Sequence, residues 1–325
     1  MKSILALVFV GLLSGCGTAV EPTEGAETAA EDKPSKVASK AGTTPKEQVF
    51  ASYQELEAYY DSIGYSFENW RNGMRAIPRV YPHDIPQRWK TVSKDLTVDH
   101  KKRIFFRALL PLVLRANEII TLERKRAEQV IGSVAAGKVA ADDEAWLLDL
   151  AKRYGIDAES AEAIDAKSLL IRVDVVPASL ALGQAAYESG YATSRFAGLG
   201  NALYGQWTWE DSGIKPEQQR EGKGDYGIAA FETPLESIRA YQHNLNTHRA
   251  YEPLRAKRAE LRKAGDPITG LALTSTLTKY SERGEEYVQT LNSIITHNRL
   301  PPTDEAYLRD DFTPVVLIPA SSKDN

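Results

Sequence analysis

The chain has 325 residues, 42% of them hydrophobic, and a formal net charge of −4 at pH 7. It is long enough for two packed units. Because the charges are mixed and nearly balanced, we expect no nucleic-acid partner. The closest of the five histidines, His243 and His248, are five residues apart, not at the i, i+4 spacing of a metal-binding helix. We expect neither a metal nor another cofactor.

Residues 1–15 are typical of a bacterial lipoprotein signal peptide. Lys2 precedes an apolar run, residues 4–13, that is too short to span a membrane. The run leads into a lipobox that ends at Cys16, the only cysteine, so we expect Cys16 to be lipidated; the alternative is an ordinary signal peptide with an incidental cysteine. Gly17 indicates sorting to the outer membrane. The expectation is a lipoprotein anchored in the membrane by its N-terminal lipid and facing the periplasm.

Residues 16–47 predict a disordered tether. They contain Glu, Thr, Ala, Lys and Ser without an apolar period, so they cannot bury enough surface to offset the entropy of ordering.

Residues 48–155 predict a helical accessory region. Apolar residues recur at helical spacings between Leu96 and Glu128, and Pro111 is expected to kink this stretch or divide it into two helices. A further helix is expected over 142–153, with Asp142 as its cap and Trp146, Leu147 and Leu150 turned inward. This region is expected to brace the following domain or extend its groove.

Polar and charged residues gather after the proline of the longer stretch. They are Arg115, Asn117, Glu118, Glu123 and Arg124. Their spacing favours a salt-bridged, solvated helix face over a functional site.

A buried helix is predicted over 176–189. Pro177 fits its first turn, small and apolar residues follow, and Gly190 supplies the stop. The helix places Glu188 in its last turn, where the negative end of the dipole and apolar surroundings both raise the pKa of a carboxyl. A carboxylic acid kept protonated near neutral pH suits general-acid cleavage of a glycosidic bond. The alternative is a glutamate that frays into water at the helix end.

An aromatic, glycine-punctuated loop follows over 201–209. Aromatic faces beside polar groups suit sugar rings, whose C–H faces stack on them. Residues 206–231 predict a loop and hairpin, and further helices fit 234–250, 253–263 and 284–297.

Four blocks of this half of the chain resemble the signature motifs of bacterial cell-wall glucosaminidases. They are residues 182–191, 201–205, 230–238 and 280–295. The resemblance implies a mainly α, lysozyme-like α+β glucosaminidase domain with a small β-lobe over 156–302, and leaves 303–325 as a C-terminal tail. With a helical region in front of it, the whole chain is most similar to Bax-type proteins.

The resemblance also implies site residues. Glu188 is the general acid, and Tyr280 is the first motif tyrosine, which orients an N-acetyl group or steadies charge on the sugar ring. The structural alternative for Tyr280 is a half-buried residue that ties two helices together, and Tyr287 is assigned to packing. The residues expected to bind substrate are Tyr191, Asn201, Tyr204, Gly205 and Trp207. The family pattern is broken at 281–284.

A second carboxylate is needed if a general base activates water. Glu221 is the preferred candidate, ahead of Glu217 and Asp225. A widely separated pair favours inversion through a bound water. Substrate assistance by the N-acetyl group would remove the need for this residue, and the sequence leaves both mechanisms open.

The predicted function is hydrolysis of peptidoglycan strands at the β-1,4 bond between N-acetylglucosamine and N-acetylmuramic acid. Two alternatives remain. One is a non-catalytic lipoprotein that binds peptidoglycan, and the other is a muramidase or lytic transglycosylase on the same fold.

Overall fold

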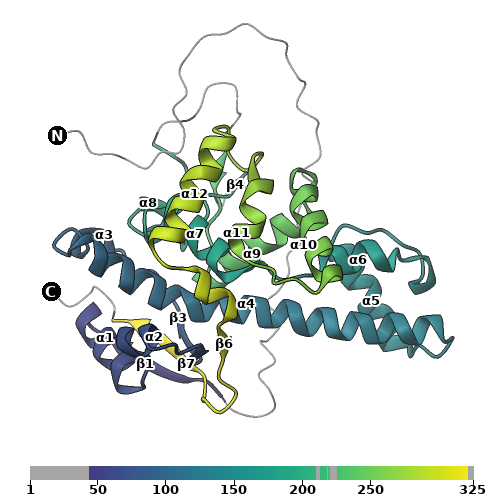
Figure 1. The fold of residues 1–325 in the computed structure, drawn as a ribbon, viewed down its shortest axis with the longest axis horizontal. Helices are drawn as coiled ribbons and strands as arrows, with labels where there is room; N and C mark the ends of the chain where they lie inside the picture. The colour runs from purple at the N-terminus through teal and green to yellow at the C-terminus, as the bar shows by residue number, and fades with distance from the viewer. Residues whose placement is uncertain (1–43, 210–212, 218, 220–224, 321–325) are drawn as a thin grey trace, which may run out of the picture.

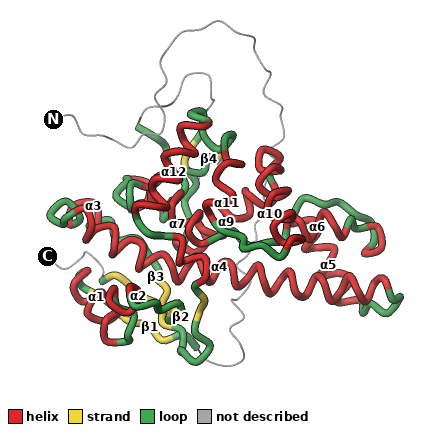
Figure 2. Tube along the Cα trace, viewed as in Figure 1, coloured by secondary structure: helices red, strands yellow, loops and turns green. Residues whose placement is uncertain are grey.

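The computed structural model describes residues 44–209, 213–217, 219 and 225–320 (Figure 1). The protein is mainly helical with small sheets, as the sequence predicts (Figure 2). The helices are α1 (Tyr53–Ser62), α2 (Phe67–Arg71), α3 (Trp89–Val92), α4 (Val98–Ala135), α5 (Ala141–Arg153), α6 (Ala166–Arg172), α7 (Ala178–Ser189), α8 (Arg195–Gly200), α9 (Pro234–Thr247), α10 (Glu252–Ala264), α11 (Gly270–Leu273) and α12 (Glu285–His297). Short 3-10 helices are η1 (Ala161–Ala163), η2 (Arg249–Tyr251), η3 (Thr274–Leu277) and η4 (Pro301–Glu305).

Helix α4 runs along the long axis of the molecule and separates two groups of elements (Figure 1). It is one helix of 38 residues, so the expectation that Pro111 divides it is wrong. Proline removes one backbone hydrogen bond from a helix. Here the residues on both sides of Pro111, from Leu109 to Ala116, are buried, and this packing holds the helix together across the missing bond. Helix α4 packs against α7 and α9, and in this way supports the domain that follows.

The C-terminal residues are part of the fold up to Pro319, although the sequence analysis assigned them to a tail. Strand β7 (Val315–Pro319) is the central strand of a parallel sheet, between β1 (Lys46–Phe50) and β3 (Val80–Pro82). Strand β6 (Tyr307–Leu308) pairs with β2 (Ala76–Ile77). Because Val315 and Leu317 are buried in the core, this C-terminal strand fixes the accessory region against the rest of the protein.

The polar residues after Pro111 form salt bridges, as expected, but they are buried or half-buried, so the expectation of a solvated face is wrong. Arg115 is buried and pairs with Glu118, which also accepts two hydrogen bonds from Arg79 at 2.9 and 2.8 Å. Asn117 donates to the backbone oxygen of Val176 at 2.8 Å and accepts from its N–H at 3.2 Å. The Asn117 bonds join α4 to the segment directly before α7, and the Arg79 bonds join α4 to the residue before β3.

The helix predicted over 142–153 is α5, and its start differs from the expectation. Helix α5 starts at Ala141 after an N-cap, Ala140, that has no side-chain bond, and Asp142 lies in its first turn instead of capping it. An acidic residue there still favours the helix through the dipole. Leu147 and Leu150 are fully buried, as predicted.

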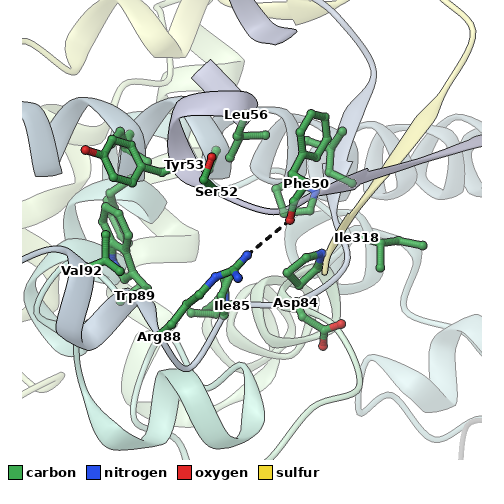
Figure 3. Close-up of a pocket in the computed structure, with 18 of the residues that line it drawn as sticks. Phe50, Ser52, Tyr53, Leu56, Asp84, Ile85, Arg88, Trp89, Val92 and Ile318 are labelled. Carbon is green, nitrogen blue, oxygen red and sulfur yellow. Dashed lines mark hydrogen bonds between the residues drawn. The ribbon is translucent and has the colours of Figure 1, made fainter. Parts of the chain in front are cut away.

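A cavity of about 320 Å³ lies where the accessory region meets the start of α4 (Figure 3). Its lining is almost entirely apolar and includes Phe50, Leu56, Trp89 and Ile318. Arg88 crosses it and donates to the backbone oxygen of Phe50 at 3.3 Å.

Residues 1–15 and Cys16 lie outside the described residues, as does most of the predicted tether, which overlaps β1 at its last two positions. Among the described helices, none has both the length and the apolar character that crossing a membrane requires.

Helices α7 and α12 come very close at Gly183. A Cβ atom built on Gly183 would lie 2.9 Å from Ile295 Cγ1 and 3.1 Å from Leu291 Cδ1, both on α12. Only glycine permits this approach without a shift of the neighbouring helix.

We predict that Gly183→Ala lowers the free energy of unfolding by about 1–3 kcal/mol, the usual cost of overpacking a core. Gly132→Ala is the control, because Gly132 also lies within a helix but has no atom within 4 Å of the added Cβ. That substitution should be neutral or stabilise the protein by up to about 1 kcal/mol. Urea unfolding of the two variants measures the difference, and equal effects would contradict the prediction.

Candidate active site

Helix α7 is buried along most of its length and is fixed at both ends. Its N-cap, Pro177, has no side-chain bond, and the cap comes instead from Asp304 in η4. The Asp304 carboxylate accepts from the backbone N–H and the hydroxyl of Ser179 at 2.8 and 2.7 Å. At the other end, Gly190 adopts the left-handed conformation with φ of 58°, which is the predicted stop.

Glu188 lies in the last turn of α7, as predicted, and is partly buried. Tyr287 of α12 donates a hydrogen bond to its Oε1 atom at 3.0 Å. Burial raises the pKa of Glu188 to about 7, while the hydrogen bond from Tyr287 acts in the opposite direction. The carboxyl is therefore about half protonated at neutral pH and can act as a general acid.

Tyrosine rings surround this carboxyl. The Tyr280 ring stacks on Tyr287 with centroids 5.4 Å apart, and Tyr187 meets Tyr287 edge-on at the same distance. Tyr251 lies 5.7 Å from Tyr280. Burial raises the pKa of Tyr280, and the nearby Glu188 adds to this effect. All four phenols thus remain neutral near pH 7 and provide an apolar wall with hydroxyl groups.

Tyr287, which the sequence assigned to packing, is the tyrosine that bonds to Glu188. Its hydroxyl, and not that of Tyr280, contacts Glu188 in the hydrogen bonds of the described residues. The signal was present, because both tyrosines lie in the block 280–295 that resembles the family motif. The packing of α12 on α7 determines which of the two tyrosines faces Glu188. The spacing of residues within the block does not determine that packing.

Tyr191 lies just beyond α7, with its ring turned toward α4. The ring meets Phe105 and Phe106 edge-on at 5.5 and 5.9 Å, and its backbone oxygen accepts from Trp89 Nε1 at 3.0 Å. Tyr191 and Ala192 have φ of 60° and 61°, a conformation that costs energy for residues with a side chain. Packing against α4 holds this strained turn in place; a contact of Tyr191 with substrate stays a prediction.

Asn201 and Tyr204 hold the loop after α8 in place. Asn201, with φ of 52°, accepts from the backbone N–H of Ile85 at 2.9 Å and donates to the backbone oxygens of Phe231 and Glu232 at 3.2 and 3.0 Å. Tyr204 is buried and stacks on Tyr241 at 3.8 Å. Both side chains thus have structural partners within the protein, and their contact with substrate is not tested.

The small antiparallel pair β4 (Trp207–Thr208) and β5 (Gly227–Ile228) agrees with the predicted hairpin. Trp207 stacks on Tyr226 at 4.2 Å, and the neighbouring Trp209 is 58% exposed. Trp209 and the half-buried Trp207 thus expose aromatic surface of the kind that stacks on sugars, while Tyr226 is buried beneath Trp207. Gly205, with φ of 60°, provides the turn before β4.

The structure does not identify the second carboxylate among its three candidates. Glu221 lies outside the described residues. Glu217 and Asp225 are both exposed, and Asp225 pairs with Lys215 at 2.9 Å. In the described part of the chain, no group of three or more His, Cys, Asp or Glu residues is arranged to hold a metal ion.

Comparison with known proteins agrees with this geometry. The model of the family described as mannosyl-glycoprotein endo-beta-N-acetylglucosaminidase matches residues 163–300, which include Glu188, Tyr280 and Tyr287. The protein is also 33% identical over 200 residues to Protein bax of Escherichia coli (strain K12), across 61% of this chain and 70% of that protein. The chain belongs to the glucosaminidase family. No solved structure shows a significant match.

Family membership makes the domain a glycoside hydrolase domain that acts on glycans. The matched range begins at 163, close to the expected domain start at 156, and ends before η4. The glucosaminidase match therefore contains α7, the aromatic loop, the hairpin and α12.

The raised pKa of Glu188 predicts a pH-dependent effect of Glu188→Gln on stability. The folded-state pKa, about 7, lies above the ordinary value of 4.5, so folding favours the protonated form. The contribution of Glu188 to the stability of the wild type is therefore fully present below about pH 4.5 and is lost as the pH rises through 7. At pH 8 the uncharged variant should be more stable by roughly 2 kcal/mol, and at pH 5 the difference should fall below about 1 kcal/mol.

Urea unfolding at the two pH values measures this effect. Glu260→Gln, which changes an exposed glutamate on α10, should show no such pH dependence. A stability difference for Glu188→Gln that is equal at pH 5 and pH 8 would contradict the assignment.

Proposed function

We propose that this glucosaminidase hydrolyses the β-1,4 bond between N-acetylglucosamine and N-acetylmuramic acid in peptidoglycan strands, with Glu188 as the general acid. The observation that carries the proposal is the position of Glu188 at the end of a buried helix, with a pKa near 7 and one carboxyl oxygen bonded to Tyr287. A group of this kind donates a proton to the leaving oxygen as the glycosidic bond breaks.

The aromatic residues support a glycan substrate. Trp207 and Trp209 offer ring faces at the hairpin, and Tyr187 and Tyr280 lie beside the acid. Sugar rings stack on such faces while their hydroxyl groups form hydrogen bonds. We propose that the glycan strand contacts both groups, with Tyr280 next to the sugar ring at the cleaved bond.

We propose that Glu221 activates the water that attacks the anomeric carbon while Glu188 protonates the leaving oxygen. The segment of Glu221 links the two strands of the hairpin, whose aromatic face would bind the strand. If instead the N-acetyl group of the substrate attacks, Glu221 has no chemical role and the reaction proceeds through an intermediate formed within the substrate.

We also propose that the protein is a lipoprotein attached through Cys16 to the outer membrane and facing the periplasm. The support is the signal-like sequence before Cys16, the lipobox form of residues 13–16 and Gly17 after it. Acyl chains contribute about 0.8 kcal/mol for each buried methylene, so several chains on one cysteine give a durable anchor. A tether of about thirty residues would then let the folded part reach tens of ångströms from the membrane.

We predict that Glu188→Gln lowers the rate of peptidoglycan digestion by several orders of magnitude and leaves the fold and glycan binding intact. Glutamine keeps the shape and accepts the bond from Tyr287, but it has no proton to donate as an acid. The release of fragments from labelled peptidoglycan measures the rate, with Glu260→Gln as the control that should behave like wild type. A Glu188→Gln protein with near wild-type activity would exclude Glu188 as the acid.

Mass spectrometry of the released fragments identifies the cleaved bond. A glucosaminidase leaves N-acetylglucosamine at the reducing end, and a muramidase leaves N-acetylmuramic acid there. A lytic transglycosylase leaves an anhydro end, and a binding protein releases nothing. Only the first result agrees with the proposal.

We predict that Cys16→Ala abolishes lipidation and leaves an uncleaved precursor or a soluble periplasmic protein. The thiol is the only site in the chain to which the acyl group of a lipobox cysteine can be attached. Membrane fractionation and mass spectrometry of the mature N-terminus measure this outcome. If Cys16→Ala fractionates like wild type and the mature protein begins elsewhere, the anchor assignment is wrong.

A further inference from the structure

Three buried polar side chains form a continuous hydrogen-bond network that ends at Glu188. We call it the hydroxyl–amide network; it consists of Tyr241 of α9, Gln184 of α7 and Tyr287 of α12. Tyr241 donates its hydroxyl to Gln184 Oε1 at 2.5 Å, and Gln184 Nε2 donates to the Tyr287 oxygen at 2.8 Å. Tyr287 in turn donates to Glu188 Oε1 at 3.0 Å. The three side chains are almost completely buried.

The direction of each bond in this network follows from the orientation of the Gln184 amide. An amide nitrogen can only donate and an amide oxygen can only accept. Because Gln184 Nε2 points at the Tyr287 oxygen, the single proton of that hydroxyl is free for Glu188. The donor at Gln184 Oε1 is Tyr241, which holds the amide in this orientation.

We propose that the hydroxyl–amide network keeps the acidic proton of Glu188 on Oε2, the oxygen from which it is given to the leaving group. This inference rests on the proposed role of Glu188 as the acid. Oε1 accepts from Tyr287 and cannot at the same time carry a proton directed toward it. No hydrogen bond from the described part of the chain reaches Oε2, which is left available to substrate.

The proton transfer balances with this arrangement. The Oε2–H bond breaks as the proton moves to the glycosidic oxygen, and the bond from that oxygen to the anomeric carbon breaks with it. Glu188 becomes a carboxylate whose Oε1 still accepts from Tyr287, and this hydrogen bond stabilises the negative charge. Tyr241, Gln184 and Tyr287 are positioning residues, since in this role they act through Glu188.

The opposite orientation of the Gln184 amide makes the opposite prediction. Tyr287 would then donate to Gln184 and accept a proton from Glu188, so its bond would favour the neutral acid. The change in the Glu188 pKa on loss of the Tyr287 hydroxyl therefore has a different sign in the two cases.

Other titratable groups near Glu188 are tyrosines that stay neutral over the pH range of interest. Those that interact electrostatically with it are Tyr187 on its own helix, Tyr241 on α9, Tyr251 in η2, Tyr280 before α12 and Tyr287 on α12. Arg283 and Glu286 form a charged pair beside Tyr187, and Arg283 also bonds to the Tyr187 hydroxyl. Substitutions in the network leave this pair in place.

The test is a titration of the Glu188 carboxyl by ¹³C NMR in full-length protein, with Tyr287→Phe, Gln184→Met and Tyr241→Phe. We expect the midpoint to move to higher pH in all three, most in Tyr287→Phe and least in Tyr241→Phe. Tyr65→Phe is the matched control, since Tyr65 is equally buried and donates to the backbone oxygen of Arg107 at 2.9 Å. Its midpoint should equal that of wild type.

A midpoint of Tyr287→Phe that moves to lower pH, or does not move, overturns the proposal. So does a shift in Gln184→Met or Tyr241→Phe no larger than that of Tyr65→Phe. Because the titration needs no turnover, it gives its result even if the protein proves inactive on peptidoglycan. In an active protein, kcat should fall about 10- to 100-fold in Tyr287→Phe, with KM nearly unchanged. The alkaline limb of the pH dependence of kcat should move with the NMR midpoint of Glu188.

Discussion

The close contact of α7 with α12 at Gly183 determines where Tyr287 lies relative to Glu188. Gly183 allows the two helices to approach each other. The next residue, Gln184, forms the hydrogen bond from α7 to Tyr287 of α12. Asp304 holds the start of α7, and Gly190 ends the helix one residue after Ser189. With both ends fixed, the carboxyl of Glu188 has little freedom to move away from the phenol that orients it.

Local signals were sufficient to predict helix α7 and the position of Glu188 in its last turn. Pro177, the run of small residues and Gly190 predicted a helix over 176–189, and the structure has Ala178–Ser189. The raised pKa of Glu188 was also expected, because a helix of small apolar residues must be buried and burial disfavours a charged carboxyl. Helices α9, α10 and α12 lie within three residues of their expected bounds for the same reason, since apolar periodicity, proline and glycine act over one or two turns.

Contacts between distant segments could not be predicted in this way. Strand β7 was assigned to a tail because its five residues gain their hydrogen bonds from β1 and β3, more than 230 residues away. Asn117 and Glu118 had the spacing of a solvated face. Inside the protein, however, Asn117 bonds to the segment before α7 and to α9, and Glu118 pairs with Arg79. Tyr287 was assigned to packing because only the fold shows that its hydroxyl faces α7.

The same burial that raises the pKa of Glu188 makes its charged form a cost to the folded state above neutral pH. A carboxyl with a pKa near 7 is destabilising once it is charged, so the protein must compensate elsewhere. The surrounding structure supplies that compensation through α4, which packs against both α7 and α9. Through Asn117 it also fixes Val176 at the entry to α7 and Gln242 on α9, the residue next to Tyr241. The accessory region therefore supports α7 and α9, two of the three helices that contribute to the hydroxyl–amide network, and α12 contributes the third side chain.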